Sequence, residues 1–129
     1  MTDPAAAGAR AAAARLTGSH GPDLAPEVEA ALYARAGTSG PVQYTDPVAV
    51  AALIVSVAQL AWTVYQDRRR TDPAPPPEVI ARHVRVRLAR EPEAPGPELE
   101  PTDRDRIIEV VIEETVRSAA EDGTAPETD

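Results

Sequence analysis

The longest apolar run in the chain extends from Val48 to Val64 and carries no charged side chain. Its apolar residues fall on every side of a helix drawn through the run, whereas a surface helix of a soluble protein has one polar face. A helix that is apolar all round lies in a large protein core or in lipid. A chain of 129 residues that is rich in proline offers little core. We therefore predict a membrane-spanning helix over residues 46–67.

The length and the flanks of this run also favour a membrane span. The stretch from Tyr44 to Tyr65 is about 31 Å long as a helix, close to the hydrocarbon thickness of a bilayer. Tyr and Trp side chains favour the membrane interface, and a run of arginines marks the cytoplasmic side. The sequence thus predicts a single-pass protein of the cell membrane, with its C-terminus in the cytoplasm. The predicted membrane-interface residues are Tyr44, Trp62, Tyr65, Arg68, Arg69 and Arg70.

A soluble alternative stays open for the same helix. Gln59 costs free energy in hydrocarbon, and the five alanines from Ala49 to Ala61 contribute little to membrane insertion. In this alternative the apolar helix is buried between the subunits of an all-helical oligomer instead of in lipid.

The residues before the apolar run predict two short helices. Asp3 followed by Pro4 is a typical helix start. The alanine-rich segment after them has almost no large apolar side chain to bury, so we expect a loose, frayed helix over residues 4–16. A second short helix is expected over residues 24–37. Together these elements form an acidic N-terminal region.

Residues 78–90 fit two patterns of secondary structure. Ile80, Val84 and Leu88 recur every four residues, as on one face of a helix. The residues from 83 to 88 also alternate between apolar and polar, as in a strand. We favour the helix, because the segment follows a run of prolines as a helix start does. The strand remains the alternative.

Residues 103–120 give the clearest amphipathic helix pattern in the chain. Thr102 with Asp105 resembles a capping box at its start. We expect its apolar stripe to pack against residues 78–90 as a helical hairpin, or against a second copy, and to form the face that binds a protein partner. The predicted partner-binding face consists of Ile107, Ile108, Val111, Ile112 and Val116.

These elements predict a mostly α fold class. It has one long apolar helix, short amphipathic helices joined by proline-rich linkers, and disordered termini. The expected order is an N-terminal region over 1–45, the apolar helix over 46–67, an Arg/Pro linker over 68–77, a helical pair over 78–121 and a disordered tail over 122–129.

Composition and charge argue against several functions. The formal net charge is −8, and a nucleic-acid partner needs a basic protein surface, so we predict none. The absence of cysteine excludes disulfides, thiolate metal sites and a cysteine nucleophile. Arginines crowd residues 68–90. We expect them to pair with the acidic helix over 103–121 more than with anionic lipid headgroups, which remain the alternative.

No group of side chains predicts catalysis or cofactor binding. His20 lies in a turn and His83 lies among arginines, without the spacing of a metal site. Glu109, Glu113 and Glu114 are expected on a solvated face opposite the apolar stripe. We therefore predict no catalytic, metal-binding or cofactor-binding residue, no cofactor, no small-molecule substrate and no enzymatic activity.

The apolar run and its arginines, followed by the proline-rich spacer and residues 79–91, resemble small uncharacterised single-span accessory proteins of high-GC bacteria. The resemblance covers about residues 44–116 and implies membrane anchoring, but no substrate, cofactor or active-site residue. The predicted function is therefore a non-enzymatic membrane-anchored adaptor that tethers a protein partner, or a second copy of itself, through a cytoplasmic helical region. The alternative is a soluble, oligomeric helical adaptor or antitoxin-like regulator.

Overall fold

The computed structural model describes residues 3–36, 46–72, 75–90 and 99–123. The described residues form helices and no strand, as the mostly α fold class predicts. The helices are α1 (Pro4–His20), α2 (Leu24–Ala36), α3 (Asp46–Arg69), α4 (Pro77–Ala89) and α5 (Pro101–Gly123).

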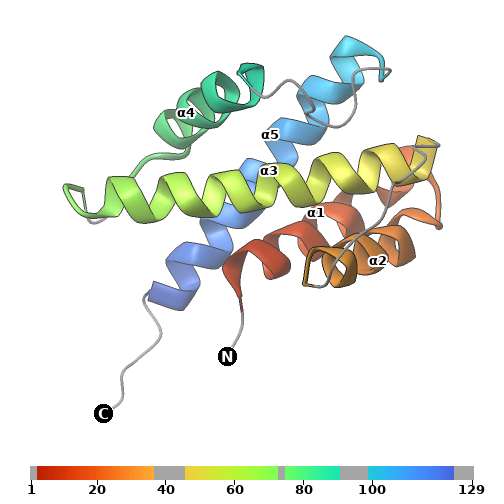
Figure 1. Ribbon diagram of the computed structural model, residues 1–129, viewed down its shortest axis with the longest axis horizontal. Helices are drawn as coiled ribbons and strands as arrows, with labels where there is room; N and C mark the ends of the chain where they lie inside the picture. Colours follow the sequence, from red (N-terminus) through yellow and green to blue (C-terminus); the bar gives the residue numbers. More distant parts are fainter. Residues whose placement is uncertain (1–2, 37–45, 73–74, 91–98, 124–129) are drawn as a thin grey trace.

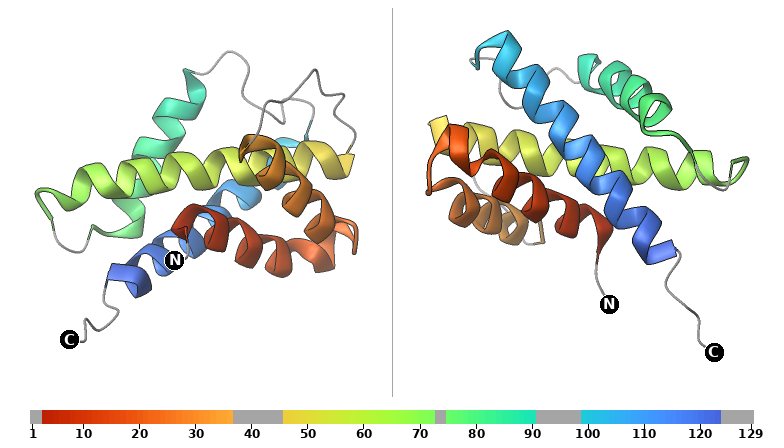
Figure 2. Two further views of the ribbon diagram at one scale, coloured as in Figure 1. Left: turned by 60° about the horizontal axis from the view of Figure 1, so that its bottom comes forward. Right: turned by 180° about the vertical axis from the view of Figure 1, so that it is seen from behind.

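Helix α3 is the centre of the arrangement and contacts each of the other four helices. Figure 1 shows α3 crossing the middle of the molecule, with α1 and α2 on one side, α4 on the other and α5 crossing behind it. The views in Figure 2 confirm that α5 passes diagonally over the face that α1 and α3 share. The long apolar helix is thus packed among helices of its own chain.

The packing of α3 explains why its apolar residues lie all round the helix. Leu53, Ile54 and Val57 are fully buried, because neighbouring helices cover several sides of α3. Its side toward solvent carries the half-buried Gln59 and the exposed Thr63. Over Val50–Arg69 the helix is long and apolar enough to cross a membrane. An 18-residue window within this span has a mean hydropathy of 1.2, and 56% of that window is buried inside the protein.

Helix α1 begins as the sequence predicts, because the Asp3 side chain accepts a hydrogen bond from the Ala5 amide at 3.2 Å and Pro4 occupies the first turn. It ends at Gly21, whose φ of 94° suits a residue without a Cβ atom. The predicted helix over residues 4–16 is present, but it is longer than predicted and packed instead of loose. Helix α1 extends to His20 and buries its small side chains.

The small residues of α1 permit its packing, because they let α5 come very close. A Cβ atom placed on Gly8 would lie 2.6 Å from the Cα atom of Thr115 in α5. Ala5, Ala9 and Ala12 are fully buried on the same helix. Large apolar side chains are therefore not required, since close backbone approach supplies the contact area.

Helix α4 confirms the helical prediction for residues 78–90, and the strand alternative is wrong. Ile80, Val84 and Leu88 form a buried stripe that faces α3 and α5. The expected contact between α4 and α5 is present, but α5 also packs against α1 and α3.

The start of α5 differs in detail from its prediction. The helix begins at Pro101, and a carboxylate oxygen of Glu100 accepts a hydrogen bond from the Asp103 amide at 3.2 Å. Glu100 therefore satisfies a free amide of the first turn, the role expected for Thr102.

Several predictions lie outside the described residues. They concern Tyr44, the linker between α2 and α3, the linker over residues 91–98 and the tail from residue 124 onward.

The close approach of α1 and α5 gives a stability prediction. We expect Gly8→Ala to destabilise the fold by about 1–3 kcal/mol, because the added methyl group meets the backbone of α5 and the helices must separate. Thermal or urea unfolding followed by circular dichroism measures the change.

Gly18 supplies the matched control in the same helix. A Cβ atom at Gly18 would meet nothing within 4 Å. Gly18→Ala should therefore stabilise the protein by about 0.5 kcal/mol through helix propensity alone. Equal effects of both substitutions would show that α1 does not pack on α5 as described.

Candidate functional site

The aromatic residues predicted at a membrane interface belong to the packing of α3. Tyr65 is 4% exposed and Trp62 is half-buried. Their rings stack with centroids 6.1 Å apart. Tyr44 lies outside the described residues. Trp62 and Tyr65 thus pack within the fold.

Arg68, Arg69 and Arg70 are exposed at the C-terminal end of α3. The chain turns here, and the Arg68 carbonyl accepts hydrogen bonds from the amides of Thr71 (3.1 Å) and Asp72 (2.9 Å). Cationic side chains at a helix C-terminus interact favourably with the helix dipole. This turn leads the chain back toward α4, which adds further arginines.

Helix α4 divides into a buried apolar stripe and an outer face rich in arginine. Arg85 forms an ion pair with Asp105 of α5 at 2.8 Å, and Arg87 forms one with Asp67 of α3 at 3.7 Å. These pairs attach α4 to both neighbouring helices. The prediction that the arginines pair with the acidic helix over 103–121 holds for Arg85, whereas Arg87 pairs with α3.

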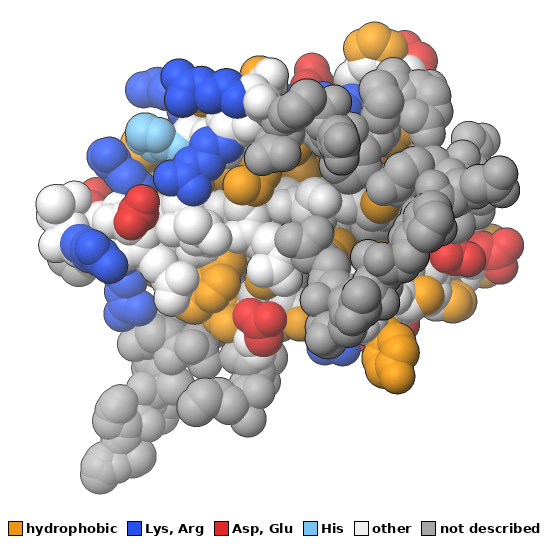
Figure 3. Space-filling view, viewed as in Figure 1, with side chains coloured by type: hydrophobic (Ala, Val, Ile, Leu, Met, Phe, Trp, Pro, Cys, Tyr) orange, Lys and Arg blue, Asp and Glu red, His pale blue; other side chains and the backbone are white. Residues whose placement is uncertain are grey.

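The remaining arginines of this region form what we call the arginine surface. All of its members are exposed, and within the described part of the chain none has a carboxylate within 4.0 Å. Figure 3 shows basic side chains gathered over α4 and the adjoining end of α3. Val86, which is 45% exposed, also lies on α4. The arginine surface consists of Arg68, Arg69, Arg70, Arg82 and Arg90.

The predicted partner-binding face lies inside the fold. Helix α5 contacts α1, α3 and α4, and its apolar stripe is buried against them. In this conformation the stripe is not accessible to a partner, so its role in partner binding stays a prediction. The buried residues are Ile107, Ile108, Val111, Ile112 and Val116.

Glu114 departs from the expected solvated face, because its side chain is 5% exposed. Arg15 of α1 donates to it at 2.9 Å and also donates to Glu113 at 3.0 Å. Arg117 donates to both Glu114 oxygens, at 3.2 and 3.3 Å. These carboxylates, with Glu114 first, raise the pKa of the Arg15 guanidinium. The cluster therefore joins α1 to α5.

The position of Glu114 could have been read from the sequence. Glu114 follows Ile107 by seven residues and Val111 by three, so it lies on the side of the apolar stripe. Its carboxylate predicts an exposed position, whereas its spacing from Ile107 and Val111 predicts a buried one, and the spacing is correct.

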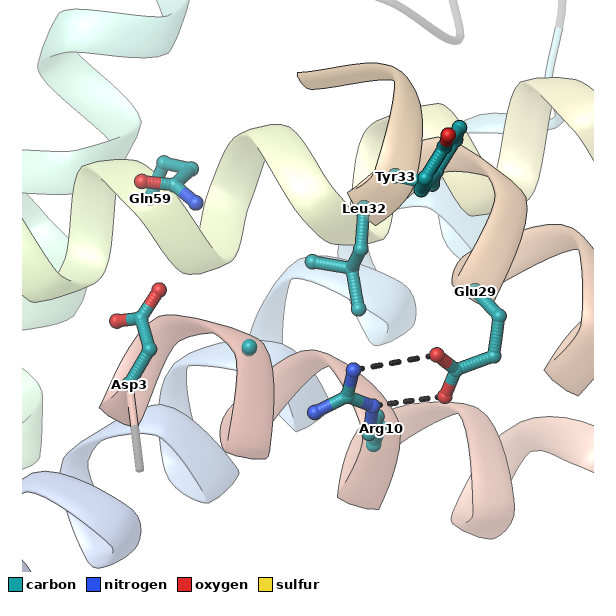
Figure 4. A pocket seen from close by; sticks show the side chains of 7 residues that line it. Asp3, Arg10, Glu29, Leu32, Tyr33 and Gln59 are labelled. Carbon is teal, nitrogen blue, oxygen red and sulfur yellow. Dashed lines mark hydrogen bonds and ion pairs between the residues drawn. The ribbon is translucent and has the colours of Figure 1, made fainter. Parts of the chain in front are cut away.

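A shallow hollow lies between α1, α2 and α3 (Figure 4). Arg10 donates to Glu29 at 2.7 and 3.2 Å across it, and Leu32, Tyr33 and Gln59 complete the labelled lining with Asp3. The hydrogen bonds to Arg10 lower the pKa of Glu29, and Glu29 raises that of Arg10. Both groups stay charged at neutral pH, which suits an ion pair between helices and not proton transfer.

Metal binding has no support within the described residues, where no three acidic or histidine side chains come together. His20 ends α1, and His83 lies exposed on the outer side of α4. The two histidines therefore belong to separate parts of the fold.

Comparison of the chain with protein-family profiles, with curated proteins and with solved structures gives no significant match. Functional inference accordingly rests on the residues of this chain.

The burial of Glu114 predicts a difference between two adjacent carboxylates. We expect Glu114→Gln to cost about 1–2 kcal/mol, because the neutral side chain loses charge-assisted hydrogen bonds to Arg15 and Arg117 at a buried position. Urea unfolding measures the loss.

Glu113→Gln is the matched control, since its side chain is 47% exposed and pairs with the same Arg15. Its cost should stay below about 0.5 kcal/mol. A larger loss for Glu113→Gln than for Glu114→Gln would contradict the arrangement of this cluster.

Proposed function

We propose that the protein is a non-enzymatic helical adaptor that binds another protein through the outer face of α4 and the adjoining end of α3. The observation that carries this proposal is the arginine surface. It presents five exposed cations without nearby carboxylates among the described residues of a chain whose net charge is −8. A segregated charge of this kind steers and orients a complementary partner.

The packing of α4 on its neighbours favours a binding role for the arginine surface over that of an ordinary solvated helix face. The buried stripe of α4 packs on α3 and α5, and the Arg85–Asp105 and Arg87–Asp67 pairs attach its edges. A surface that is ordered before binding loses less conformational entropy when a partner arrives.

In this proposal α3 serves as the core of the adaptor. Its apolar side chains have partners within one chain, since Leu53, Ile54 and Val57 are fully buried. The burial of these residues within one chain supports a core role for α3. This differs from the oligomer alternative, in which the helix is buried between subunits.

A second candidate keeps the adaptor role and places α3 in the cell membrane, with the C-terminus in the cytoplasm. The length and hydropathy of Val50–Arg69 favour it. Core helices of soluble proteins can have the same properties, and membrane insertion of α3 requires its contacts with the other four helices to be given up.

Fractionation separates the two candidates. We expect carbonate extraction of the cells to release the full chain into the soluble fraction. Purified without detergent, the protein should elute from size exclusion as a single species, with the mass of one chain by light scattering. Retention in the membrane pellet, or dependence on detergent, would support the membrane candidate. A defined larger mass would support the oligomer alternative.

The adaptor role is tested by site-specific cross-linking in the native cell. A photo-reactive residue at Val86 should form discrete protein adducts, and the Arg68→Gln/Arg69→Gln/Arg70→Gln variant should lose them. The same photo-reactive residue at Gly18, an open position on α1, serves as the control. Absence of adducts at Val86, or equal adducts at Gly18, would reject the proposed surface.

A further inference from the structure

We propose that the arginine surface recognises an acidic segment of the partner protein, in which one apolar residue between carboxylates contacts Val86. This inference rests on the proposed adaptor function and adds the chemistry of the partner. Arginine binds carboxylates in a bidentate geometry, so an acidic segment matches exposed guanidinium groups in both charge and shape.

The first part of the argument is the spacing along α4. Arg82 and Val86 lie four residues apart on α4, and Arg90 follows after four more as its C-cap residue. Because the backbone of Arg90 is still in the right-handed helical region, the three lie along one side of the helix. Each interval is about 6 Å along the helix axis. The outer side of α4 thus offers a cation, an apolar contact and a second cation over about 12 Å. Such a row fits a segment with carboxylates on both sides of an apolar residue.

The second part is the place of α3 beside this row. Helix α4 packs on α3, and Arg87 pairs with Asp67 in the last turns of α3 at 3.7 Å. The end of α3, with Arg68, Arg69 and Arg70, therefore lies beside α4, and Figure 3 shows basic side chains gathered in this region. Arg85 and Arg87 already have carboxylate partners. The charge available to a partner therefore comes from the two ends of the α4 row and from the end of α3.

An anionic membrane fits this surface less well than an acidic segment does. An amphipathic helix that binds at a bilayer surface combines its cations with exposed aromatic or long apolar side chains that enter the interface. Tyr65 is buried, Trp62 is half-buried, and Val86 is the one exposed large apolar residue described on α4.

The charge of the whole chain leads to the same choice. Residues 68–90 hold seven arginines against Asp72 and Glu78, while the rest of the chain holds six arginines against 19 acidic residues. An extended anionic surface, such as a bilayer or a nucleic acid, repels that acidic remainder. A short acidic segment contacts one end of the protein and avoids this repulsion.

The test measures binding of a fluorescent helical peptide of about 16 residues. The peptide carries Glu, Leu and Glu at positions that are four residues apart from one another. Fluorescence anisotropy with the full-length protein should detect binding, while the same peptide with Gln at each Glu position should bind at least about tenfold more weakly. Raising the salt concentration from 50 to 300 mM should weaken binding about tenfold, because exposed charges are screened.

Substitutions locate the binding site. Arg82→Gln/Arg90→Gln should weaken binding about tenfold, and Val86→Ala about fivefold through lost apolar contact. Arg106→Gln removes an exposed charge from α5, outside the arginine surface, and should leave binding within about twofold. Thermal melts of each variant confirm that the fold is intact.

Four outcomes would overturn the proposal. They are tighter binding to anionic phosphatidylglycerol vesicles than to the peptide, equal binding to single-stranded DNA, equal losses in the Arg106→Gln variant, and a salt-sensitive dimer that competes with the peptide. Adducts at Val86 in the native cell together with any of these outcomes would leave the adaptor function in place and reject the acidic partner. Absence of adducts at Val86 in the otherwise unaltered protein would reject the adaptor function itself.

Discussion

The removal of α3 from water is the constraint on which the rest of this fold depends. A run of 17 uncharged residues cannot remain exposed, and the chain covers it with helices from both sides of the sequence. The helices that cover α3 pack in more than one way. Helix α4 supplies branched apolar side chains, α1 supplies small residues, and α5 connects the two. The arginine surface exists because α4 is held in place by this packing.

Much of the secondary structure could be predicted from the sequence, because it depends on local signals. The Asp3–Pro4 start, the four-residue recurrence in α4 and the apolar stripe of α5 each identify a helix without knowledge of its neighbours. The packing of α1 on α5 is different. Alanine and glycine give almost no hydrophobic pattern, and the contact between Gly8 and Thr115 joins residues far apart in the chain. No local signal predicts which small residue meets which helix.

The candidate site was predicted only in part, because it too depends on contacts between residues far apart in the chain. The arginine cluster is visible in the composition of residues 68–90, but which of its charges are available depends on tertiary ion pairs. Asp67 and Asp105 pair with Arg87 and Arg85. Among the residues that the structure describes, the arginines of this region without a carboxylate within 4.0 Å are those of the arginine surface. Val86 had no distinguishing feature in the sequence. Its exposure follows from the direction in which Ile80, Val84 and Leu88 pack.

The pairing of α1 with α5 has a consequence for synthesis on the ribosome. Of the five described helices α1 is synthesised before the others, yet α5, a partner that it shares with α3, is synthesised after the other four. While translation is in progress, α3 is outside the exit tunnel before α5 can cover it. Contacts between distant parts of a chain form late, and uncovered apolar surface invites aggregation in the meantime. Nascent chains that stop before Pro101 lack α5 and therefore leave part of their most apolar helix uncovered.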